Sequence, residues 1–270
     1  MLGKLLKYEF KSTARVFLPL YITILVVAII NSFFINSELF QIQGLLMTVF
    51  VALMIAMFVI TVIVIVQRFN KNLLGDEGYL MFTLPVNSTT ILFSKYLIAL
   101  LWTLLSAIVA VVAFFLITSV PIFSEMGFDL NYWINTIQEY FYLIIGKDFI
   151  YYAISLTLLT FVSYSIFIFT VYLSLSMGQL PLFNKHRNLY SFISFIGINV
   201  LFSFIQNLFT SLYFSNNIDQ TIISVQNNAI DGFNSFIQDG LFAVLGFNLI
   251  LLLVLFLGTK FLLDNKLNLE

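Results

Sequence analysis

The chain contains no cysteine and few charged residues. Without cysteine, a disulfide framework, a cysteine-ligated zinc site and a thiol nucleophile are all excluded. Lys, Arg, Asp and Glu make up 9% of 270 residues, whereas an ordinary soluble domain carries about 25%. Hydrophobic residues make up 61%, and the mean hydropathy is +1.03. This composition excludes a soluble globular protein and indicates an integral membrane protein.

Motifs for nucleotide or hydrolytic chemistry are also missing. The sequence contains no G-x-x-x-x-G-K-[ST], no H-E-x-x-H and no G-x-S-x-G. The single histidine, His186, lies between Lys185 and Arg187 and is interpreted as a solvated loop residue. We therefore expect no enzyme activity, no catalytic residue, no metal and no cofactor in this chain.

Six stretches are long and apolar enough to cross a hydrocarbon core of about 30 Å as helices. The expected fold is all-α: a single polytopic transmembrane domain over residues 1–270, with spans at 16–35, 44–66, 96–120, 149–177, 190–214 and 241–263. The first apolar run is longer than a signal-peptide core, so we expect it to remain attached.

Basic residues set the expected orientation. Of the twelve Lys and Arg residues, only Lys147 falls in a predicted external segment. By the positive-inside rule, both termini are expected in the cytoplasm and the chain in the cell membrane. The predicted cytoplasmic residues are Lys4, Lys7, Lys11, Arg15, Arg68, Lys71, Lys95, Lys185, Arg187, Lys260 and Lys266.

Residues 1–15 have the pattern of an amphipathic helix. Leu2, Leu6, Phe10 and Ala14 recur every four residues, and the basic residues occupy the opposite face. Such a helix is expected to lie in the membrane interface, like an elbow before the first span. The same lysines also serve as a topology signal.

The loop over residues 67–95 is much longer than the usual connection between two helices. Gly75 to Gly78 would end the preceding helix, and Asn87 or Ser88 is expected to cap the next one. An acidic pair followed by a short aromatic and apolar run favours a docking surface for a cytoplasmic protein. The alternative is a loop lying on the membrane surface. The predicted docking residues are Asp76, Glu77, Gly78, Tyr79, Leu80, Leu84 and Pro85.

Polar residues elsewhere are uncharged or external. Segments 121–148 and 215–240 are expected to form external amphipathic helices. No acidic residue lies in the centre of a span, which counts against a proton relay. The neutral polar residues there are expected to form hydrogen bonds between helices rather than to bind a ligand: Asn199, Gln206, Asn207 and Asn248.

The layout resembles the membrane-spanning subunit of ATP-binding cassette exporters of the ABC-2 type, which are common in Gram-positive bacteria. The resemblance is sharpest at residues 2–10, LGKLLKYEF, and at residues 76–95, DEGYLMFTLPVNSTTILFSK. A stretch E-G-Y-L-x-x-x-L-P-V after the second span, and a lysine before the third, are features of that family. The matching residues are Glu77, Gly78, Tyr79, Leu80, Leu84, Pro85, Val86 and Lys95.

The resemblance implies a six-helix permease that pairs with a second permease, identical or not, in the lipid bilayer. Each permease would dock a cytoplasmic ATPase through a coupling helix around residues 76–85, and ATP would be bound by that partner. The cargo would be a hydrophobic or amphipathic peptide, antibiotic or lipid-like molecule, and nucleic acid is not expected as a partner. Two alternatives remain: an ion- or proton-coupled carrier, and a membrane sensor or anchor that transports nothing.

Overall fold

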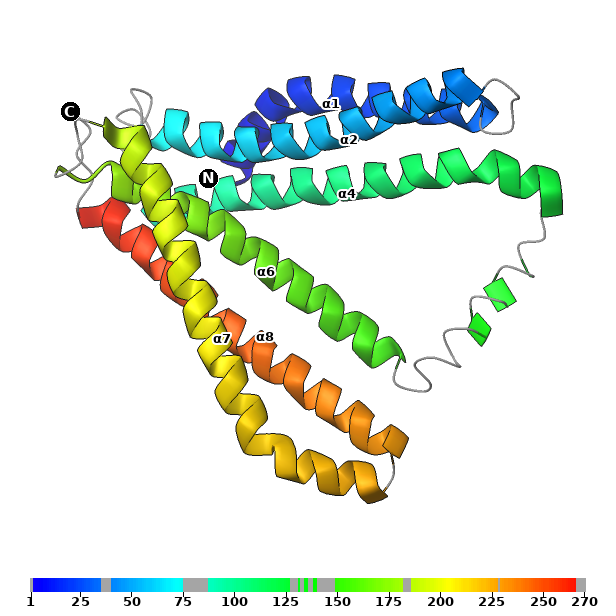
Figure 1. Ribbon diagram of the computed structural model, residues 1–270. Coiled ribbons are helices and arrows are strands. Elements are labelled where there is room, and N and C mark those ends of the chain that lie inside the picture. Colours follow the sequence, from blue (N-terminus) through cyan, green and yellow to red (C-terminus); the bar gives the residue numbers. More distant parts are fainter. Residues whose placement is uncertain are drawn as a thin grey trace. The chain divides into compact units, whose positions relative to one another are not determined.

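The computed structural model is built from long helices (Figure 1). It describes residues 2–34, 40–74, 87–126, 131, 134–135, 138–139, 149–181, 186–227 and 229–265, and no strand occurs within these ranges. Six of the helices are long and apolar enough to cross a membrane. The elements are α1 (Leu2–Phe34), α2 (Phe40–Phe69), the short π-helix η1 (Asn70–Leu74), α4 (Ser88–Met126), α6 (Phe149–Gly178), α7 (Arg187–Asn227) and α8 (Ala229–Asn265).

All six predicted spans are confirmed as helices, and each helix extends beyond the predicted apolar run. The greatest extension is at the start of the first span, where α1 is continuous from Leu2. A separate elbow helix over residues 1–15 is therefore not confirmed. Pro19 lies inside α1 and lacks the N–H of one helical hydrogen bond, which favours a bend. Figure 1 shows the first turns of α1 at an angle to the remainder.

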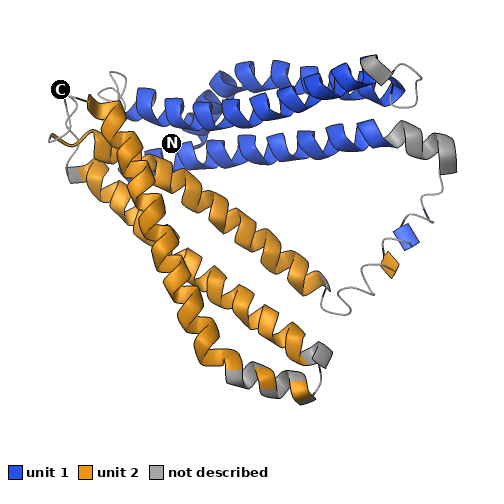
Figure 2. Cartoon of the chain, in the orientation of Figure 1, with its two compact units in different colours: residues 1–136 blue, residues 137–270 orange. Residues whose placement is uncertain are grey.

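The helices divide into two compact units, Met1–Thr136 and Ile137–Glu270 (Figure 2). In unit 1, Glu9 contacts Lys95, Thr13 contacts Trp102 and Tyr21 contacts Ser106. The residue numbers on α1 and α4 rise together along these three contacts, so the two helices run parallel. In contrast, α2 runs antiparallel to α1, because Ser12 bonds to Arg68 near one end and Asn31 to the Leu46 carbonyl near the other.

A regular seam on α1 explains its packing on α4. Phe10, Ala14, Phe17, Tyr21 and Ile24 alternate in steps of four and three residues, which is the spacing of helices that pack nearly in line. The cluster formed there is the core of unit 1, and it includes Phe17, Tyr21, Ile24, Ala28, Phe50, Met57, Ile98, Trp102, Ala113 and Ile117. Large apolar side chains on the outer faces are exposed, as lipid-facing residues would be.

Unit 2 repeats this pattern of directions. Tyr152 bonds to the Asn234 carbonyl and Phe169 contacts Phe256, so α6 and α8 run parallel. The helix that lies between them in the sequence, α7, runs antiparallel to both. Its Phe209 ring stacks on Phe247 at 4.4 Å between ring centres, whereas Phe214, further along α7, contacts the earlier Phe236 of α8. No side chain is buried in the most apolar 18-residue stretch of α7.

The two predicted external segments differ in how much of them is described. Residues 215–227 and 229–240 are helical, but as continuations of α7 and α8, so a separate cap helix is not confirmed. In the other segment, 121–148, α4 continues to Met126, and most of the residues beyond it lie outside the described residues.

Candidate functional site

All seven predicted docking residues fall within residues 75–86, outside the described residues: Asp76, Glu77, Gly78, Tyr79, Leu80, Leu84 and Pro85. Both flanks of this loop are described. The carbonyl of Asn87 accepts hydrogen bonds from the backbone N–H groups of Thr90, at 2.8 Å, and Ile91, at 3.3 Å. Asn87, one of the two predicted caps, therefore occupies the N-cap position of α4.

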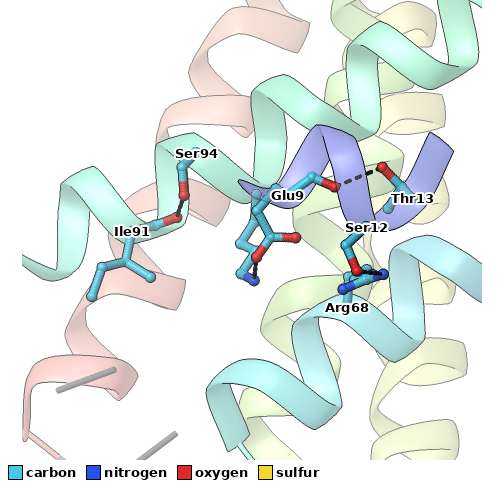
Figure 3. Close-up of polar contacts among 7 residues, drawn as sticks. Glu9, Ser12, Thr13, Arg68, Ile91 and Ser94 are labelled. Carbon is cyan, nitrogen blue, oxygen red and sulfur yellow. Dashed lines mark hydrogen bonds and ion pairs between the residues drawn. The ribbon is translucent and has the colours of Figure 1, made fainter. Parts of the chain in front are cut away.

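Four side chains connect the flanks of the loop to the first turns of α1. We name this group the loop anchor: Glu9, Ser12, Arg68 and Lys95. The Lys95 ammonium donates to Oε1 of Glu9, and the two side chains are 1% and 8% exposed. Nη2 of Arg68, at the end of α2, donates to Oγ of Ser12 at 2.5 Å. Figure 3 shows Glu9 and Ser12 on the same stretch of α1, with Ser12 directed toward Arg68.

An aromatic stack lies beside the loop anchor. The Trp102 indole is nearly parallel to the rings of Phe10 and Phe17, with ring centres 5.0 Å and 4.6 Å away. Its Nε1–H donates to Oγ1 of Thr13 at 2.6 Å, and that hydroxyl donates to the Glu9 carbonyl at 2.8 Å. The buried indole therefore has its N–H partner, and α1 and α4 are held in register.

The apolar face predicted for residues 1–15 contacts protein. Leu6 and Ala14 pack against the core of unit 1, and Phe10 stacks on Trp102, although it is 40% exposed. Lys11 and Arg15 are exposed, as the pattern predicted. In the structure, this face lies against α4, because Trp102 and the residues around it offer an apolar surface there.

Further polar contacts follow the contact between α1 and α4 toward the middle of unit 1. The hydroxyls of Tyr21 and Ser106 are 2.7 Å apart, and the Tyr21 hydroxyl also lies 3.1 Å from the Trp102 carbonyl. Oγ1 of Thr61 on α2 lies 3.5 Å from Oγ of Ser106. These contacts join all three helices of unit 1, and the hydroxyls of Tyr21, Thr61 and Ser106 each have a partner.

Unit 2 contains a pocket of about 220 Å³ between α6, α7 and α8. Its residues lie near the centres of three candidate spans, and none of them is charged. The apolar part of the lining includes Phe167, Phe202 and Leu251. The polar part consists of Ser163, Thr170, Asn199, Ser203, Gln206 and Asn248.

The predicted interhelical hydrogen bonds of the amide residues are not found within the described residues. Nδ2 of Asn199 donates at 2.7 Å to the Phe195 carbonyl, in its own helix. Asn248 is 4% exposed and makes no hydrogen bond to another described residue. Gln206 and Asn207 are exposed on α7. Three of the four amides, those of Asn199, Gln206 and Asn248, instead line the pocket.

The Glu9–Lys95 ion pair was not predicted from the sequence, although the position of Glu9 on its helix indicates a buried partner. On a helical wheel, Glu9 lies beside Leu6 and Thr13, well away from Lys7 and Lys11. An acid on the apolar side of an amphipathic helix needs a buried cationic partner.

Within the described part of the chain, no group of three or more His, Cys, Asp or Glu residues could hold a metal ion. His186 is exposed, in agreement with its interpretation as a solvated residue.

Compared with protein-family models, with curated proteins and with solved structures, the chain matches none. The class of the protein therefore follows from its own features. Six apolar helices of membrane-spanning length, together with the composition, indicate a multi-pass membrane protein.

Proposed function

We propose that this chain is the permease subunit of an ABC-2 type exporter in the cell membrane, with both termini in the cytoplasm. It pairs with a second permease, and a separate cytoplasmic ATPase docks on the loop that includes Glu77 and Tyr79. ATP-driven closure of the ATPase switches the pathway between inward- and outward-facing states, each favoured by a different set of contacts. The cargo is a hydrophobic or amphipathic molecule.

The loop anchor is the observation that carries this proposal. A loop that transmits force needs both of its ends attached to the helices that it moves. The segments on either side of residues 75–86 are bonded to one stretch of α1, through Arg68 with Ser12 and Lys95 with Glu9. A displacement of the loop would therefore move α1, α2 and α4 together. A loop that only rests on the membrane surface has no need of such attachments.

The pocket in unit 2 supports transport of an uncharged or amphipathic molecule over proton coupling. A proton-coupled carrier requires an ionisable side chain at mid-membrane depth. The pocket is lined by hydroxyls, carboxamides and apolar side chains without a charged group.

Site-directed crosslinking tests the docking. Because the chain has no cysteine, Thr83→Cys introduces a unique thiol within the predicted docking loop and keeps all seven predicted docking residues. Native membranes are treated with a short thiol–amine crosslinker, and the adducts are identified by mass spectrometry. We expect an adduct with a soluble protein that carries the Walker A motif. Gln226→Cys, in the predicted external segment, is the control and should give no such adduct.

A Thr83→Cys chain that is inserted and reactive toward a small maleimide, yet forms no adduct with a nucleotide-binding protein, would contradict the proposal. The maleimide reaction shows that the thiol is accessible, so a negative result has a definite meaning.

A further inference from the structure

A polar stripe runs along α7 through the membrane-spanning region. Asn199, Ser203, Gln206 and Thr210 recur in steps of four, three and four residues, so they share one face of the helix. Asn199, Ser203 and Gln206 are all exposed on the surface of unit 2. A helix face in contact with lipid is expected to be apolar, because hydrocarbon offers no hydrogen-bond partner.

Asn248, on α8, is a further polar residue in this region. Its side chain is 4% exposed, lines the pocket and has no hydrogen-bond partner among the described residues. A carboxamide has two N–H donors and an acceptor oxygen, and those of Asn248 are accessible from the pocket, so an occupant could bond to them. One bridging water occupies roughly 10–15 Å³ of such space, whereas the pocket measures about 220 Å³. The pocket therefore has room for an occupant much larger than a single water molecule.

The lining defines the chemistry of the occupant. Gln206 and Asn248 each offer two N–H donors and an acceptor, whereas Asn199 offers its oxygen and the one N–H that does not bond to the Phe195 carbonyl. No charged side chain is present to balance an ionic ligand. Phe167 and Phe202 add aromatic surface beside these amides. A backbone amide flanked by apolar side chains has the complementary properties: it is uncharged, donates one hydrogen bond and accepts another.

We propose that the pocket between α6, α7 and α8 binds the uncharged backbone amides of a hydrophobic peptide, which is the cargo. This inference deepens the proposed transport function by naming its substrate class, and it rests on that function. Ser203 and Gln206 on α7 contact the peptide from one side and Asn248 on α8 from the other.

Cysteine labelling measures access to the pocket. Ser203→Cys places a thiol in the lining, and Leu201→Cys places one at almost the same depth on another face of α7. Both variants are tested in native membranes with a small, water-soluble thiosulfonate. Thiols react as thiolates, which require water. We therefore expect the thiol at 203 to react at least about tenfold faster than the thiol at 201.

Ligand protection then tests the substrate class. The probe is N-acetyl-dileucine amide, and its control is the ester analogue of the same shape, which lacks one N–H donor. We expect the amide to slow labelling at position 203 and the ester to do so at roughly tenfold higher concentration, as the loss of one hydrogen bond implies. Asn248→Leu should remove the protection by the amide and leave labelling in its absence intact.

Three results would overturn the inference. Equal labelling at positions 203 and 201 would mean that the stripe is not accessible to water. Labelling without protection by the amide, or equal protection by amide and ester, would mean that the pocket admits water but does not recognise peptide amides. None of these measurements involves the ATPase, so their failure is distinguishable from failure of the docking test.

Discussion

Lys95→Met should loosen the start of α1 from α4. The substitution leaves the Glu9 carboxylate, whose side chain is 8% exposed, without its cation. Removing one partner of a buried ion pair costs about 3–5 kcal/mol, which corresponds to a change of roughly two to three and a half orders of magnitude in the folding equilibrium. Lys11→Met is the matched control: Lys11 is exposed on α1, and its loss should change stability by no more than about 0.5 kcal/mol.

Trp102 provides the assay for this prediction. The chain contains two tryptophans, so a Trp133→Phe background leaves Trp102 as the sole indole. Because its N–H donates to Thr13 of α1, its fluorescence reports separation of α1 from α4. Thermal unfolding of the purified protein in mild detergent should show a transition that Lys95→Met lowers by several degrees or more.

The double variant Glu9→Leu/Lys95→Met distinguishes a charge effect from lost packing. With both charges gone, no unpaired ion remains buried, and such apolar replacements are often neutral or stabilising. We expect the double variant to recover most of the stability lost in Lys95→Met. A double variant as unstable as the sum of the two single variants would refute the reasoning, since the two side chains would then contribute independently.

Three further substitutions test hydrogen bonding in unit 1 and packing in unit 2. Tyr21→Phe removes the hydroxyl that bonds to Ser106 in unit 1 and should lower stability by about 0.5–1.5 kcal/mol in the same unfolding assay. Gly178→Ala would place a Cβ 1.9 Å from Oγ of Ser191 in unit 2, and such overpacking should cost about 1–3 kcal/mol. Gly197→Ala, where a Cβ meets no neighbour within 4 Å, should be neutral or stabilising in thermal unfolding.

The six helices were predictable because membrane crossing imposes a length and an apolar composition that can be read locally. Their ends were less accurate, since polar ends such as residues 2–15 continue a helix without contributing to the apolar run. Which helices pack together could not be read in this way. Glu9 and Lys95 are 86 positions apart in the sequence, and the residues around each of them do not indicate that the two come into contact.

The amides of the spans show the same division between local pattern and tertiary contact. Their presence in α7 and α8 was evident, and the general tendency of such residues to bond across helices was the reasonable expectation. The structure instead brings Asn199, Gln206 and Asn248 to one pocket, because α6, α7 and α8 leave space between their polar faces. Only the arrangement of three helices, which no single segment determines, reveals this.

Co-purification from the native membrane tests the central claim most directly. The wild-type chain, extracted in mild detergent, should bring with it a stoichiometric soluble protein that carries the Walker A motif, and a second permease if the pair is heteromeric. The variant Glu77→Ala/Tyr79→Ala should lose the ATPase while keeping the unfolding transition reported by Trp102. A chain that is recovered intact and without any nucleotide-binding protein would contradict the account.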